Sequence, residues 1–171
     1  MNPAFWMTLG VPLEVHAPRQ RAHAAQPQRA LHEIALIEQM CECLNGPAFS
    51  GDGAMRIPVA IIEASLAHLD LAWIHPFGDG NGRTARLCEF LVLVTSGVPT
   101  SAAHLISNHC NKARDEYYGQ LQYASESGGD VTRFLSYYAA GFVDGLGEQL
   151  RWIYDRQYRL VSPGTSTSAN R

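Results

Sequence analysis

Apolar residues recur every three or four positions along most of this chain, and this spacing is typical of amphipathic helices. The first helix is predicted over residues 28–44, because the apolar stripe stops at Gly46 and Pro47. A second helix is predicted to carry Pro58 in its first turn, where a missing amide hydrogen does no harm. The expected core positions are Leu31, Ile34, Ile37, Met40 and Leu44 in the first helix, and Val59, Ile62, Leu66, Leu69 and Trp73 in the second.

Three more helices are predicted in the second half of the chain. Helical spacing resumes over residues 83–96, returns over residues 113–125, and begins again after Asp130, which can cap the last long helix. In that last helix Gly141 and Gly145 would let another helix approach closely, although chance gives the same spacing. The expected apolar faces are Leu87, Leu91 and Val94, then Tyr117, Leu121 and Ala124, and finally Phe134, Tyr138, Phe142, Leu146 and Leu150.

The pattern as a whole predicts a mainly helical, single-domain fold. Residues 1–27 are rich in Pro, Gln and Ala and contain only a short strand-like patch, so we expect a loop or hairpin there. Residues 28–158 form the expected helical core. Residues 159–171 are rich in Ser, Thr, Gly and Pro, and we expect a disordered tail.

Charge and cysteine content exclude several classes of protein. The formal net charge is −3 and Lys112 is the only lysine, which argues against a nucleic-acid partner. We expect no membrane segment and no signal peptide, because the apolar runs are short and interrupted. The four cysteines match no zinc or disulfide pattern, so free thiols in the cytoplasm are expected.

Polar chemistry concentrates in one segment, from His75 to Arg86. Gly80 and Gly82 flank Asn81, and such a turn can aim its amide hydrogens at one anion. A predicted helix begins directly afterwards and adds its positive dipole end. Arg83 and Arg86 lie one turn apart on that helix and can both reach a polyphosphate. The sequence therefore predicts a phosphate site here.

Two further residues of this segment suggest what happens at the phosphate. Asp79 would repel a phosphate unless a cation lay between them, so magnesium bound to a nucleotide is predicted. His75 ends the preceding helix, and an imidazole accepts protons near neutral pH. The prediction is a general base beside an activated phosphate.

The segment His75-Pro76-Phe77-Gly78-Asp79-Gly80-Asn81-Gly82-Arg83-Thr84-Ala85-Arg86 resembles the signature of the Fic family at every position. The resemblance implies a Fic-like helical bundle that transfers AMP from ATP to a hydroxyl of a target protein. His75 would be the general base and Asp79 the Mg²⁺ ligand. The implied nucleotide-binding residues are Gly80, Asn81, Gly82, Arg83 and Arg86, and Phe77 would face inward to anchor the loop.

The resemblance also implies features that the residues alone do not locate. A short β-hairpin flap that aligns the target would lie within residues 11–29. The acid at Asp79 favours AMP transfer over phosphoryl transfer, because a phosphorylating relative carries Lys there. No Ser or Thr is followed, after three residues, by Glu and then Gly or Asn, so self-inhibition through that glutamate is not expected. A separate antitoxin-like inhibitor, a segment of a longer protein, and no inhibition at all remain open.

Other interpretations remain open from the sequence. The chain could transfer a phosphoryl group, another nucleotide or phosphocholine, or it could be an inactive nucleotide-binding module held by an antitoxin-like partner. A translocated effector is the alternative to a cytoplasmic protein. His68 fits a core histidine with satisfied hydrogen bonds, and Tyr117 and Tyr118 fit packing roles better than adenine contacts.

Overall fold

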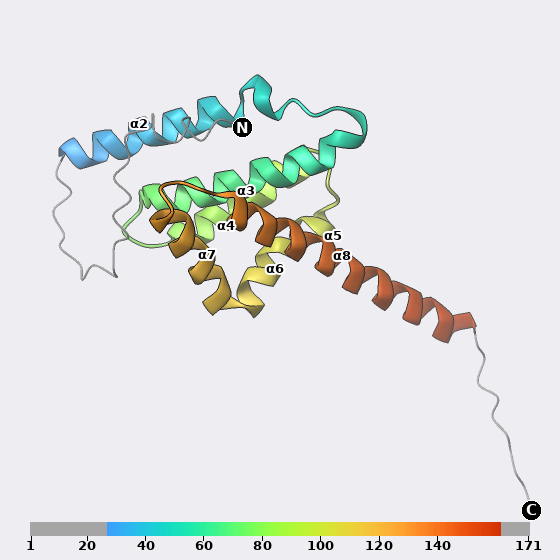
Figure 1. Ribbon diagram of the computed structural model, residues 1–171. Helices are drawn as coiled ribbons and strands as arrows, with labels where there is room; N and C mark the ends of the chain where they lie inside the picture. The colour runs from blue at the N-terminus through green and yellow to red at the C-terminus, as the bar shows by residue number, and fades with distance from the viewer. Residues whose placement is uncertain (1–26, 162–171) are drawn as a thin grey trace, which may run out of the picture.

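The computed structural model describes residues 27–161, and these residues form a helical bundle (Figure 1). The predicted mainly helical fold is confirmed. No strand occurs between residues 27 and 161; most of the flap predicted in residues 11–29 lies outside the described residues, and its last three residues begin α2. The elements are α2 (Pro27–Leu44), the 3-10 helices η1 (Pro47–Phe49) and η2 (Gly53–Met55), α3 (Arg56–Ile74), α4 (Asn81–Thr95), α5 (Thr100–Ala103), α6 (Leu105–Lys112), α7 (Arg114–Glu126) and α8 (Thr132–Val161).

Helix α3 lies at the centre of the bundle and packs along α4, its neighbour after a six-residue loop (Figure 1). Its other sides contact α2 and α8. Small residues such as Ala64 and Ala67 are fully buried and let the neighbouring helices come close. The pair of α3 and α4 is therefore the frame from which the connecting loop projects.

The central position of α3 also bears on its composition. Gly53–Ile74 is long and apolar enough to cross a membrane by length and composition alone. A core helix passes the same test, and α3 contributes eight buried residues to this fold. The composition of α3 is therefore explained by packing between other helices of the bundle.

Helix α6 packs against α8 at two glycines. A Cβ atom added to Gly141 would lie 2.5 Å from Cδ2 of His109, and one added to Gly145 would lie 3.1 Å from Leu105. Both distances are shorter than ordinary van der Waals contact. The suggestion that these glycines permit a close helix approach is thus confirmed, and α6 is the helix that approaches.

Several predicted apolar faces are only partly buried. Leu31 and Ile34 are exposed, because α2 packs against α3 and α4 through later residues such as Met40. On α4 the expected core positions Leu87 and Leu91 are wrong because both are exposed, whereas Val94 packs against the core as expected. The buried residues of α4 are Asn81, Ala85, Glu89 and Leu93. In α8 the predicted core holds through Phe142, whereas Leu150 is exposed where the helix stands clear of the others (Figure 1).

Candidate active site

The loop begins with an unusual backbone conformation at His75. Helix α3 ends at Ile74, and His75 follows with φ 51° and ψ 51°, while its N–H donates to the Leu71 carbonyl over 3.1 Å. This left-handed position after a helix is commonly taken by glycine, because a Cβ atom is strained there. His75 is the only non-glycine residue with positive φ within residues 27–161. Such strain often marks a functional position.

Asn81 closes the loop from within. Its Oδ1 accepts the Phe77 N–H over 2.8 Å, and its Nδ2 donates to the Phe77 carbonyl over 2.5 Å. The Asn81 side chain is buried, whereas Phe77 is 47% exposed, so the inward-facing Phe77 expected from the family is wrong. The loop is anchored through the backbone of Phe77, and Asn81 supplies both contacts.

Helix α4 starts without a side-chain cap. Gly80 is its N-cap residue, with φ 89°, and it carries no side chain that could bond the first amides. The helical ladder begins when the Thr84 N–H donates to the Gly80 carbonyl over 2.9 Å. The amides at the start of α4, beside Gly82, are therefore left for a ligand, at the positive end of the helix dipole.

Asp79 and Arg83 form an ion pair at the rim of the loop. The Asp79 Oδ2 atom lies 3.0 Å from Arg83 Nη2, and Asp79 Oδ1 accepts the Gly80 N–H over 2.7 Å. Both side chains are largely exposed, so the pair adds little to stability and can exchange for other partners. No group of three or more acidic, His or Cys side chains suited to a metal gathers within the described residues. One carboxylate still fits Mg²⁺, which takes its remaining ligands from phosphates and water.

Arg86 lies between the loop and the core. Its Nε is buried and makes no hydrogen bond within the described residues. Its positive charge lowers the pKa of Cys110 and Tyr117, although desolvation is the larger cause and leaves both pKa values raised, that of Cys110 to about 11. A buried donor without an acceptor needs an explanation, and an anionic ligand would provide one.

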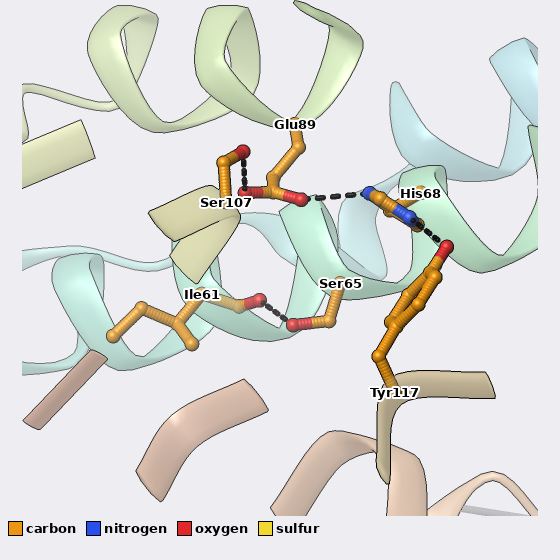
Figure 2. A network of polar contacts seen from close by, with 6 residues as sticks. All are labelled: Ile61, Ser65, His68, Glu89, Ser107 and Tyr117. Atoms are coloured by element: carbon orange, nitrogen blue, oxygen red, sulfur yellow. Dashed lines mark hydrogen bonds and ion pairs between the residues drawn. The ribbon is translucent and has the colours of Figure 1, made fainter. Parts of the chain in front are cut away.

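Beneath the loop, a chain of buried polar side chains joins four helices (Figure 2). His68 contacts Glu89 and Tyr117, so its predicted role as a satisfied core histidine is confirmed. Tyr117 is buried as a packing residue, while Tyr118 is exposed. Sequence reasoning missed Glu89, although its position midway between Ala85 and Leu93 on the helix repeat could have shown that it faces the core.

A second, partly buried carboxylate, Asp70, lies on another side of α3. Desolvation raises the pKa of Asp70 to about 7, and the Asp70 charge contributes to the raised pKa of Cys43 on α2. Asp70 forms no hydrogen bond or ion pair with any residue in the described range. Thus Asp70 lies on the α2 side without a polar partner among the described residues, whereas Glu89 faces α3 and α6 neighbours that satisfy it.

Comparison with known proteins agrees with the loop geometry. The protein adenylyltransferase Fic of Nematostella vectensis is 33% identical over 103 residues, which make up 60% of this chain and 22% of the relative. The protein adenylyltransferase fic-1 of Caenorhabditis briggsae is 40% identical over 104 residues, 61% of this chain and 18% of the relative. This chain thus spans about a fifth of the length of these curated relatives.

A shorter match is also to a protein named as an adenylyltransferase. The protein adenylyltransferase Fic of Aedes aegypti is 40% identical over 76 residues, which make up 44% of this chain and 14% of the relative. The Fic/DOC family model matches residues 13–93, a stretch that contains the whole loop and its two flanking helices except the last two residues of α4. Residues 13–93, slightly less than half of this chain, are therefore similar to the Fic/DOC family.

Proposed function

We propose that this chain transfers AMP from ATP to a hydroxyl side chain of another protein. The observation that carries the proposal is the strained His75 at the end of α3, joined by a short closed loop to the uncapped start of α4. His75 is exposed, and only five residues separate it from the start of α4. A base so close in sequence to an anion site suits a transfer from a phosphate.

Phosphate binding would fall to residues of the loop and of α4. The turn at Gly80, Asn81 and Gly82 offers backbone amides, and the α4 dipole favours negative charge there. Arg83 would leave Asp79 and turn to the nucleotide, since their exposed pair is weak. The unpaired Nε of Arg86 would gain an acceptor.

The reaction requires a base and a neutralised leaving group. His75 takes the proton of the target hydroxyl, whose oxygen bonds to the α-phosphorus while the bond to the β-phosphate oxygen breaks and pyrophosphate leaves. Asp79 would hold Mg²⁺, which would neutralise charge on the phosphates. Ser, Thr or Tyr can each supply the hydroxyl, and a cytoplasmic target and a separate antitoxin-like inhibitor are part of the same proposal.

Radiolabelled ATP tests this function. The purified chain is incubated with magnesium and a lysate, once with α-³²P-ATP and once with γ-³²P-ATP. Protein labelled by the α-label alone supports AMP transfer, whereas labelling by the γ-label would indicate phosphoryl transfer. His75→Ala should abolish the α-label, and Leu87→Ala, an exposed change on α4, is the control. Undiminished labelling by His75→Ala would overturn the assigned mechanism.

A further inference from the structure

Three buried side chains and the partly buried Ser107 form a continuous polar chain (Figure 2). His68 Nδ1 lies 2.7 Å from Glu89 Oε2, and His68 Nε2 lies 2.8 Å from the Tyr117 hydroxyl. The Ser107 hydroxyl donates to Glu89 Oε1 over 3.1 Å. The four residues come from α3, α4, α6 and α7, and His68 and Glu89 are almost fully buried. Each link therefore fixes one helix against another.

For a neutral His68 imidazole, the chemistry of its partners sets the direction of each hydrogen bond. Burial raises the pKa of Tyr117, so its hydroxyl keeps its proton. A neutral imidazole donates from one nitrogen and accepts at the other. The Nδ1–H of His68 donates to the Glu89 carboxylate, and Nε2 accepts from Tyr117. Every polar atom in the chain then has a partner, and a buried network with all partners present favours one arrangement.

His68 on α3 and Glu89 on α4 lie at similar distances along their helices from the loop that connects them. His68 precedes His75 by seven residues on α3, and Glu89 follows Asn81 by eight residues on α4. Seven or eight helical residues span about 10–12 Å, or two turns. A slip of one helix along the other would break this link, and it would also move the two ends of the loop apart.

We propose that the chain of Tyr117, His68, Glu89 and Ser107 positions His75 relative to the start of α4, by holding α3 and α4 in one register. The proposal rests on the AMP transfer proposed above. These are positioning residues, since they lie in the core and act through the two helices. Nothing else in the described residues joins α3 to α4 by a side-chain hydrogen bond.

The division of roles between the two helices makes the proposal specific. The residues proposed to bind the nucleotide lie in the loop and on α4, whereas the proposed base terminates α3. Loss of the register should displace the base from a nucleotide that is still bound. We expect kcat to fall while the affinity for ATP stays near its wild-type value, because small displacements of a reacting group are costly.

Three variants separate positioning from simple packing. Glu89→Met keeps the volume but accepts no hydrogen bond, and we expect kcat to fall about 10- to 100-fold. Glu89→Gln still offers an oxygen to His68 and should restore most of kcat. Ser65→Ala is the matched control, because the Ser65 hydroxyl is also buried but donates within α3, to the Ile61 carbonyl over 2.6 Å. It should leave kcat unchanged.

Two measurements decide between outcomes. The Kd for Mg-ATP is measured by calorimetry together with kcat, and hydrogen exchange of the amides in residues 75–83 is followed without nucleotide. Faster exchange in Glu89→Met but not in Ser65→Ala supports the positioning role. This holds even if the wild type transfers no AMP, because that absence would contradict only the proposed function. Unchanged exchange, an equal loss in kcat and ATP affinity, or no rescue by Glu89→Gln would overturn the positioning role.

Discussion

Polar side chains gather in two regions of this molecule, and the regions differ in how their groups are satisfied. Around the loop and the start of α4, the Asp79–Arg83 pair is exposed, and Arg86 Nε has no hydrogen-bond partner within residues 27–161. Two turns below, His68 and Glu89 are buried and fully hydrogen-bonded. The first arrangement leaves groups available to a ligand, whereas the second leaves none. We infer that polar groups around the loop are suited to ligand binding, whereas those in the core hold the helices together.

The largest expected effect is the loss of AMP transfer when His75 in the loop is replaced. His75→Gly should lower the AMP-transfer rate by about 10² to 10⁴-fold, because the base is lost. It should also stabilise the fold by about 1 kcal/mol, because glycine adopts the left-handed conformation without strain. Activity assays and urea unfolding measure the two effects. His75→Ala is the control, since it loses the base but keeps the strain; equal stability of both variants would contradict the interpretation of His75.

Asp70, which has no hydrogen-bond partner among the described residues, should make the stability of the fold depend on pH. The folded pKa of Asp70 is raised to about 7 by desolvation, so the folded state holds its proton more tightly than the unfolded chain. Stability should therefore fall as the pH rises from about 4 to above 7. Asp70→Asn should remove this fall and be more stable than wild type by about 2–4 kcal/mol at pH 8.

Urea unfolding of Asp70→Asn at pH 5 and pH 8 measures this difference. Asp144→Asn, an exposed change on α8, is the control and should show no such dependence. The difference in stability between Asp70→Asn and wild type should be larger at pH 8 than at pH 5. An equal difference at both pH values would mean that Asp70 is a hydrogen-bonded carboxylate like Glu89.

Packing of the core away from the loop gives a smaller effect. Gly141→Ala would place a methyl group 2.5 Å from the His109 ring, so α6 and α8 must separate. We expect a loss of about 1–3 kcal/mol in the free energy of unfolding, with AMP transfer unchanged below the melting temperature. Gly147→Ala, where the nearest neighbour is an Arg151 nitrogen at 3.9 Å, is the matched control. Thermal unfolding of both variants measures the contrast.

The smallest effect is expected at the rim of the loop. Asp79→Asn breaks the exposed pair with Arg83, and the free energy of unfolding should change by less than about 1 kcal/mol. AMP transfer and its response to magnesium should nevertheless drop, because Asp79 is the proposed Mg²⁺ ligand. A magnesium titration of activity measures this. A clear loss of stability in Asp79→Asn would erase the distinction between the two polar regions.

The sequence predicted the helices and the loop because both depend on local spacing. Gly46-Pro47 and Gly97 mark helix ends that the structure confirms, and the His75–Arg86 segment carries its chemistry in consecutive residues. The roles of His75, Asp79 and the nucleotide-binding residues stay predictions.

Tertiary contacts decided what the sequence did not predict. Leu87 and Leu91 have the spacing of a core face, yet α4 turns Glu89 inward because His68 and Ser107 are there to satisfy it. No spacing along one helix reveals partners that two other helices supply. The left-handed backbone at His75 was equally hidden, since histidine rarely takes that conformation after a helix.

The buried chain of hydrogen bonds also constrains the order in which the protein folds. His68 and Tyr117 are 49 residues apart in sequence, so their contact must await the docking of α7. Until then water, and not tyrosine, solvates the imidazole, and closing the bundle means expelling that water. We expect Tyr117→Phe to accelerate unfolding far more than it slows refolding, which stopped-flow kinetics would show.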